Sequence, residues 1–243
     1  MERVLVLGAT SAIAAEIAAL HAARGDRLHL VGRDPRKLQA LSARIPEATI
    51  ESADLVTVDP EALVQRAVHA LGGLDRVLIA HGALGDQLET QRSAAAAAFV
   101  ITTNFTSVVM LLVPLANLLE RAGAGRIGVI TSVAGDRGRP RNYTYGAAKG
   151  ALHVYLQGLR TRLYGSGVAV TTLKLGPVDT PMTRDHAKHA LFGKPARVAR
   201  GIVRAMDGRQ AEAYVPSVWR LIMPLVVHTP EVVFQKLAFL SGR

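Results

Sequence analysis

Three side chains able to handle a proton stand close together in the sequence: Ser132, Tyr145 and Lys149. On a helix, the spacing of four places Tyr145 and Lys149 on one face, a turn apart. A free phenol titrates near ~10, and a neighbouring ammonium favours the phenolate and lowers the pKa. Ser132 follows the apolar run 127–131, so we expect it at the end of a strand. The set predicts proton transfer to or from a carbonyl or alcohol oxygen.

Two alternatives remain open at this point. A tyrosine–lysine pair at this spacing is weak by itself, and Tyr145 could be half-buried on an amphipathic helix with Lys149 at the surface. Asn104 lies in the apolar middle of an alanine-rich segment, where its amide needs a partner. It could hold a water that links Lys149 to bulk solvent, or it could be a satisfied buried asparagine without a catalytic role.

The N-terminus predicts a phosphate site, with a buried strand over 4–7, a turn at Gly8 and a helix to about residue 24. The free N–H groups of a helix N-terminus attract phosphate. The usual dinucleotide fingerprint has three glycines, whereas Ala12 and Ala14 stand at the second and third positions here. A strand–turn–helix unit without a ligand is the alternative. The expected cofactor contacts at this end are Gly8, Thr10, Ser11, Ala12 and Ile13.

The second expected strand, 28–31, ends at Gly32 and Arg33. An acidic residue near this position binds the ribose hydroxyls of NAD, whereas an arginine accommodates the 2′-phosphate of NADP. We therefore predict NADP(H) over NAD(H), with an ordinary exposed loop arginine as the alternative for Arg33. Asp34 followed by Pro35 is typical of a helix start.

Further strands are expected at 49–52, 77–80, 127–131, 168–175 and 211–215, with helices at 35–44, 60–71, 145–164 and 195–206. One long helix over 87–120 is expected, kinked by Pro114. Loops after the strands supply the other candidate cofactor contacts: Asp54 and Leu55 near the adenine edge (or a turn), His81 and Gly82 near a ribose, and Pro177, Val178 and Thr180 near the nicotinamide.

The alternation predicts an α/β fold: one doubly wound, Rossmann-type parallel sheet of about seven strands with helices on both faces. We expect a single catalytic domain over 1–216, with a substrate lid near 183–195, and an apolar tail over 217–243. Arg137, Arg139 and Arg141 form an arginine loop that is either solvated or faces a substrate phosphate or carboxylate. The tail could pack against a partner subunit or contact a membrane or lipid-linked substrate.

Composition narrows the classes of function that the chain could have. The 243 residues carry a net charge of +10 and no cysteine, which excludes disulfides and thiolate chemistry. The arginines are scattered, so no nucleic-acid partner is expected. His186 and His189 have no carboxylate cluster at metal spacing, so no metal is expected. No run of eighteen apolar residues and no signal peptide are evident, which favours the cytoplasm.

The chain resembles a short-chain dehydrogenase/reductase over about residues 3–216. The residues that carry the resemblance are, in chain order, Gly8, Arg33, Asp54, Asn104, Ser132, Tyr145, Lys149 and the 176–182 loop. The resemblance implies that Tyr145 is the acid/base and that Lys149 binds the ribose and lowers the pKa of Tyr145. It also implies that Ser132 polarises the carbonyl and Asn104 serves a proton relay. A homodimer or homotetramer is implied as well. The chain departs from the family at Ala12 and Ala14, at 80–83 and at Leu175.

The Gly8–Ser11 start, the His81–Gly82 loop and the apolar tail are similar to the decaprenylphosphoryl 2-keto-pentose reductase branch, which acts on a lipid-linked sugar. The expected activity is therefore NADP(H)-dependent interconversion of a carbonyl and a secondary alcohol, on a small or lipid-linked substrate. Peripheral membrane contact through the tail would accompany a lipid-linked substrate. The alternatives are a reductase for 3-oxoacyl groups on an acidic carrier and a non-catalytic NADP(H)-binding regulator.

Overall fold

The computed structural model describes residues 1–184 and 191–237. Its centre is a seven-stranded parallel sheet in the order β3-β2-β1-β4-β5-β6-β7. This confirms the predicted fold class, with small shifts at the strand ends. The strands are β1 (Arg3–Leu7), β2 (Arg27–Gly32), β3 (Thr49–Ser52), β4 (Arg76–Ile79), β5 (Gly125–Ser132), β6 (Val168–Leu175) and β7 (Glu212–Val215).

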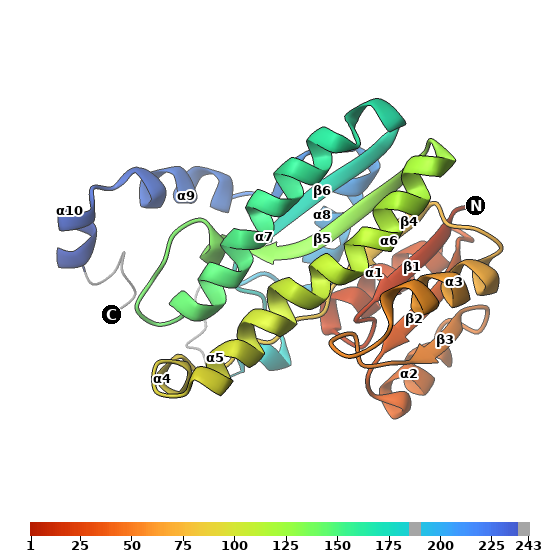
Figure 1. Cartoon of the computed structure of the whole chain (residues 1–243), viewed down its shortest axis with the longest axis horizontal. Coiled ribbons are helices and arrows are strands. Elements are labelled where there is room, and N and C mark those ends of the chain that lie inside the picture. The colour runs from red at the N-terminus through yellow and green to blue at the C-terminus, as the bar shows by residue number, and fades with distance from the viewer. Residues whose placement is uncertain (185–190, 238–243) are drawn as a thin grey trace.

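Helices cover both faces of the sheet (Figure 1). One core layer joins the sheet to α3 (Pro60–Leu71), α6 (Ser107–Ala122) and α7 (Tyr143–Arg162). The other joins it to α1 (Ala12–Ala22), α2 (Pro35–Ser42) and α8 (Pro195–Asp207). Because both faces are covered, the central strands are mostly apolar, and Val4 to Leu7 of β1 are fully buried.

The strand order reverses between β1 and β4, which lie side by side although β2 and β3 separate them in the sequence. Ligands of open α/β sheets bind in the crevice at such a reversal, beyond the carboxyl ends of the strands. The loops after β1, β4 and β5 therefore border one crevice. They carry Gly8, His81 and Ser132, respectively.

The expected single helix over 87–120 is wrong. The structure has α4 (Gln87–Thr90), a break, α5 (Ala94–Ile101), a π-helical turn (Thr102–Thr106) and then α6. The break occurs because the side chain of Ser93 accepts a hydrogen bond from the amide of Ala96 and starts a new helix. Pro114 lies inside α6, as expected.

The continuous helix Ala94–Ala122 is, among the described residues, the one long and apolar enough to cross a membrane by length and composition. Its α6 part nevertheless packs into the core, where Val108, Leu111, Leu112 and Leu115 are fully buried. This packing accounts for the apolar residues on the inner side of α6.

The tail forms α9 (Trp219–His228) and α10 (Glu231–Lys236), which extend away from the sheet as an arm (Figure 1). The arm is attached to the rest of the chain by Trp219, Met223, Val226 and Phe234, which pack with Val133. Residues 185–190 of the expected lid and residues 238–243 of the tail lie outside the described part of the chain.

Candidate active site

Ser132 is the last residue of β5, where the chain turns into a short 3₁₀ helix, Val133–Gly135. Its hydroxyl accepts a hydrogen bond from the amide of Ala134 at 3.1 Å and donates to the carbonyl of Leu175 at 3.4 Å. Ser132 pairs with Leu175 in the sheet register, so β6 holds it from the side. The predicted position at a strand end is confirmed.

Tyr145 and Lys149 lie one turn apart on α7, as their spacing predicts. The Nζ atom of Lys149 is 5.8 Å from the centre of the Tyr145 ring and donates to the carbonyl of Ile130 at 3.2 Å. The 3₁₀ helix after Ser132 packs directly on α7: a Cβ placed on Gly135 would lie 2.7 Å from the backbone of Lys149. Glycine at this position therefore fixes the serine-bearing turn against the helix that carries the pair.

Burial dominates the electrostatics of the pair. It raises the pKa of Tyr145 to about 12, and a hydrogen bond with Ser132 acts in the opposite direction. Burial also lowers the pKa of Lys149, which is 2% exposed, to about 8. The expected lowering of the phenol pKa is therefore wrong for this structure, because the desolvation of Tyr145 outweighs the opposing effect of Ser132.

Asn104 lies in the π-helical turn and is fully buried. Its Nδ2 donates to the carbonyls of Ala83 at 2.6 Å and Val100 at 2.8 Å, and its Oδ1 accepts from the amide of Ala83 at 3.2 Å. The amide thus clamps the loop after β4. A Cβ on Gly82 would lie 2.7 Å from this Oδ1 and 3.5 Å from Nζ of Lys149, so Gly82 brings the loop, the asparagine and the lysine together.

The loop after β4 also meets the turn after β1. Gly8 has φ of +82°, and a Cβ there would lie 2.6 Å from the amide nitrogen of His81. The Nε2 atom of His81 is 2.9 Å from the hydroxyl of Ser107. Burial, followed by the charge of Lys149, lowers the pKa of His81 to about 3, so the imidazole is neutral. His81 acts here as a packed, hydrogen-bonding loop residue.

The turn after β1 can hold a phosphate. Ser11 caps α1 by accepting from the amide of Ala14 at 3.1 Å, and its carbonyl accepts from Ala15. The amides of Ala12 and Ile13 precede the first intrahelical hydrogen bond and so remain available to an anion. Ala14 is inside α1 and fully buried, where its methyl group is part of the core. The alanines at the family's glycine positions thus fit the helix without closing the turn.

The end of β2 explains the missing carboxylate. A Cβ on Gly32 would lie 2.9 Å from Cγ2 of Thr10, so no acidic side chain fits there. Asp34 caps α2 through the amides of Arg36 and Lys37, as predicted. Arg33 is exposed beside this end of the sheet.

Two other predicted contact regions are well defined. Asp54 accepts a hydrogen bond from the amide of Val56 at 3.0 Å and so acts as a turn residue, which was the alternative to an adenine contact. Leu55, the next residue, is buried. In the loop after β6, Val178 is buried and pairs with Gly193, while the amide of Thr180 donates to the hydroxyl of Thr183 at 3.2 Å. Pro177 accepts from the amide of Gly193 at 2.9 Å.

A charged cluster beside Ser132 was missed by sequence reasoning. Asp136 contacts Nζ of Lys174 at 2.9 Å, Nδ1 of His153 at 3.4 Å and the hydroxyl of Tyr214 at 2.9 Å. Lys174 also pairs with Glu212 at 3.0 Å. The lysine in the apolar strand 168–175 was the available signal, because a buried lysine needs an acidic partner.

Arg137 of the arginine loop attaches the C-terminal arm. Its Nη1 donates to the carbonyls of Val226 at 2.7 Å and Thr229, its Nη2 pairs with Glu231 at 2.7 Å, and its guanidinium lies 3.9 Å from the ring centre of Phe234. For Arg137, the solvated alternative is wrong.

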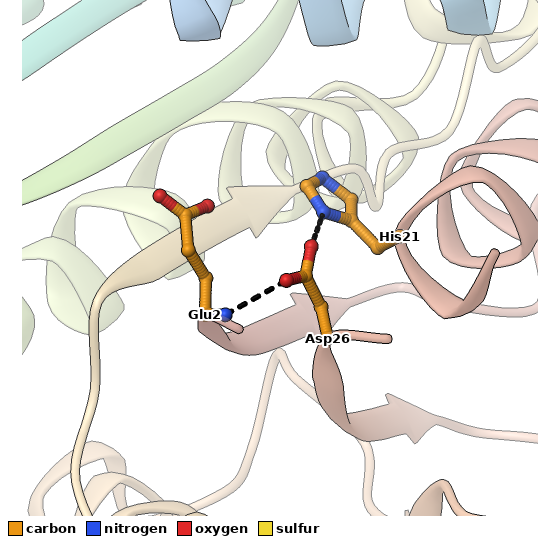
Figure 2. A group of neighbouring side chains, drawn as sticks. All are labelled: Glu2, His21 and Asp26. Carbon is orange, nitrogen blue, oxygen red and sulfur yellow. Dashed lines mark hydrogen bonds and ion pairs between the residues drawn. The ribbon is translucent and has the colours of Figure 1, made fainter. Parts of the chain in front are cut away.

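A second polar group lies at the other end of the strands, just before β1 and β2. There Glu2, His21 and Asp26 are near enough to share a metal ion. Asp26 already accepts from the amide of Glu2 at 2.7 Å and contacts Nδ1 of His21 at 2.7 Å, while the Glu2 carboxylate points away from this pair (Figure 2). That carboxylate pairs with Arg76 at 2.8 Å and with Arg126. A hydrogen bond between His21 and Asp26 and the ion pairs of Glu2 thus account for all three side chains.

Comparison with known proteins gives concordant results. The family described as short chain dehydrogenase matches residues 2–190. An uncharacterized oxidoreductase of Streptomyces coelicolor is 34% identical over 239 residues, which cover 96% of this chain and 94% of that protein. Two solved structures share the fold. A short-chain dehydrogenase from Streptomyces avermitilis has a TM-score of 0.81 at 19% identity and covers 93% of each chain. An actinorhodin polyketide ketoreductase with NADPH has a TM-score of 0.79 at 24% identity, covering 88% of this chain and 95% of that one. The chain therefore belongs to the short chain dehydrogenase family and is an oxidoreductase.

Proposed function

We propose that this enzyme interconverts a carbonyl and a secondary alcohol with NADP(H), and that Tyr145 transfers the proton. The observation that carries the proposal is the convergence of Ser132, Tyr145 and Lys149 at the end of β5 and the start of α7. The ammonium of Lys149 lies 5.8 Å from the Tyr145 ring, and the Ser132 hydroxyl lowers the pKa of Tyr145 against the larger effect of burial.

Each side chain has a distinct role in this proposal. A pKa of about 12 keeps the phenol of Tyr145 protonated at neutral pH, as a proton donor for carbonyl reduction must be. The Ser132 hydroxyl orients the substrate oxygen toward that phenol. Lys149 supplies a positive charge beside the ring and holds the ribose hydroxyls, and Asn104 fixes the loop that borders both. Bound NADP(H) would supply the hydride.

The residues at the crevice fit a dinucleotide. Gly8 lets the loop after β4 pack closely on the turn after β1, and the amides of Ala12 and Ile13 are available to a phosphate. Gly32, packed against Thr10, provides no carboxylate of the kind that an NAD ribose prefers. Exposed Arg33 supports the 2′-phosphate preference. Titration of the purified protein with NADPH and NADH, followed by nicotinamide fluorescence, tests this. Tighter binding of NADH than NADPH would contradict it.

The catalytic role of Tyr145 is tested by Tyr145→Phe, which keeps the ring and removes the proton. Turnover of carbonyl substrates should fall by about 10²- to 10⁴-fold while NADPH binding stays unchanged. Full activity of this variant would refute the mechanism. Tight cofactor binding without turnover of any carbonyl or alcohol by the wild type would favour the non-catalytic regulator.

Two substrate classes follow from surface features. The arm exposes Leu221 and Leu225, which are 76% and 74% exposed, and an apolar surface of this kind favours a lipid-linked sugar and peripheral membrane contact. The net charge of +10 favours the alternative, an acyl group on an acidic carrier. Lipid vesicles that raise turnover support the first class, and salt-sensitive binding of a carrier protein supports the second.

The assembly and domain proposals rest on the same structure. The outer faces of α5, α6 and α7 expose Phe99, Met110 and Val154, at 54%, 53% and 69%. We expect these faces to pair in a homodimer or in the dimers of a homotetramer. Residues 1–216 then form the catalytic domain, and residues 217–243 an appended arm. Light scattering of the wild type and of Met110→Glu tests the pairing, because a buried charge would dissociate it.

A further inference from the structure

The three arginines of the arginine loop have different surroundings. Arg137 is bound to the arm, as described above, and Arg141 is exposed. Arg139 is half-buried, and its Nε has no hydrogen-bond partner. The contact of its guanidinium is with Sδ of Met223, at 3.7 Å. A thioether is a weak acceptor, so the charge of Arg139 is partly desolvated without a strong hydrogen-bond acceptor.

The nearest acidic group does not serve Arg139. The carboxylate of Asp136 is already engaged by Lys174, His153 and Tyr214. Burial lowers the pKa of Arg139 and the charge of Asp136 raises it, but guanidinium remains protonated in proteins. Within residues 1–184 and 191–237, therefore, no carboxylate forms a hydrogen bond with this half-buried cation.

A second unpartnered donor lies on the same side of the arm. The indole Nε1 of Trp219 is buried and has no hydrogen-bond partner. Trp219 and Met223 are one turn apart on α9 and belong to the same small apolar cluster. Met223 thus contacts Arg139 and packs with Trp219, so that two donors without acceptors border one patch.

This patch adjoins the reacting groups. A Cβ on Gly176 would lie 2.0 Å from Nε1 of Trp219, and the preceding residue, Leu175, accepts the hydrogen bond of Ser132. The carboxyl end of β6, at Leu175 and Gly176, therefore lies between Ser132 and the indole of Trp219. A substrate whose carbonyl meets Ser132 would extend from there toward Trp219 and Arg139.

We propose that Arg139, assisted by the indole N–H of Trp219, binds a carboxylate or phosphate group of the substrate, so that the enzyme acts on an anionic carbonyl compound. The inference rests on the proposed function and specifies its substrate class. Guanidinium recognises both anions through paired N–H donors, and a buried site without competing acids strengthens the contact.

Trp219 makes the test independent of turnover, because it is the single tryptophan in the chain. Its fluorescence is followed in the presence of saturating NADP⁺ during titration with 4-oxo-4-phenylbutanoate, with its methyl ester and with phenyl phosphate. The acid should give a saturable change in Trp219 fluorescence at concentrations at least about 30-fold lower than the ester does. This factor is at the low end of the affinity change expected when a desolvated charge gains or loses its partner. Tighter binding of phenyl phosphate than of the acid assigns the site to phosphate.

Arg139→Gln should remove the preference for the anion, and Arg139→Lys should restore part of it. Arg141→Gln is the matched control, because it removes the same charge from the same loop at an exposed position. Equal binding of acid and ester by the wild type, or an unchanged preference in Arg139→Gln, would overturn the proposal. In turnover assays, Arg139→Gln should raise KM for the acid and leave that for the ester unchanged. Anion binding by a protein that reduces no carbonyl would refute the proposed function and leave the site in place.

Discussion

Replacing the buried Lys149 should make the protein more stable. Lys149 is 2% exposed, and burial lowers its pKa from 10.5 to about 8. A shift of this size corresponds to about 3 kcal/mol at pH 7, by which the folded state disfavours the ammonium. Lys149→Met removes that penalty and loses the hydrogen bond to Ile130, which is worth about 1 kcal/mol. The net expectation is a gain of about 2 kcal/mol, together with a loss of activity.

The stability difference between the wild type and Lys149→Met should depend on pH. Because the folded pKa of Lys149 is the lower one, the unfolded state binds more protons between pH 8 and 10.5. The stability of the wild type should therefore rise relative to that of Lys149→Met through this window. Near pH 9.5 the two proteins should have about the same stability, since the remaining penalty of about 1 kcal/mol matches the lost hydrogen bond. Urea unfolding at pH 7 and 9.5 measures both values.

Lys174 is the matched control. It is also buried, at 7% exposed, but it pairs with Asp136 and Glu212. Burial alone would lower its pKa, and these carboxylates raise it above the ordinary value. Lys174→Met removes the ammonium from both acids, which keep only hydrogen bonds to His153, Tyr214 and Gln157, and should destabilise the protein by about 3 to 5 kcal/mol. Loss of stability in Lys149→Met, or a gain that is the same at both pH values, would refute the reasoning.

Three other substitutions probe the site and its frame. Gly82→Ala places a methyl group 2.7 Å from Oδ1 of Asn104, so kcat should fall by at least about 10-fold in an NADPH oxidation assay; an unchanged kcat would contradict the clamp. Burial raises the pKa of Asp136, but its hydrogen bonds to His153 and Lys174 hold it below 3.8. Its stabilisation is therefore lost as the pH falls below about 4, and Asp136→Asn should flatten this acid limb in thermal melts. Arg76 is 2% exposed and pairs with Glu2 and Asp207, so Arg76→Met should lower the free energy of unfolding by about 3 kcal/mol, measured by urea unfolding. An unfolding midpoint equal to that of the wild type would argue against a stabilising role of these pairs.

The sequence predicted the sheet because its strands are continuous apolar runs closed by glycine and capping residues, as at Gly8 and Asp34. It also predicted that Tyr145 and Lys149 share a helix face, since that relation depends on spacing alone. Their roles, and those of Ser132 and Asn104, stay predictions. Resemblance to the family gave the proton relay. The spacing of Tyr145 and Lys149 and the resemblance both predicted a lowered phenol pKa. That prediction was wrong because desolvation depends on packing from several elements.

Features that arise from contacts between distant segments were not predictable. The arginine loop reads as a solvated run, yet Arg137 binds backbone carbonyls of the arm some ninety positions later. Likewise, no local pattern indicates that Trp219 covers Gly176. The break before Ala94 was missed although Ser93 is a capping residue, because the following alanines favour helix so strongly that the serine was read as part of it.

The π-helical turn at Thr102–Thr106 also affects how the chain can change in length. Such a turn accommodates an additional residue compared with an α-helical turn. Deleting one residue there would restore a regular helix and leave the rotation of α6 relative to α5 nearly unchanged, because the wider turn had absorbed that residue. The side chains of Leu111 and Leu115 would therefore still face the core. We therefore expect a single-residue deletion in this turn to be tolerated by the core and to act on the asparagine within the turn instead.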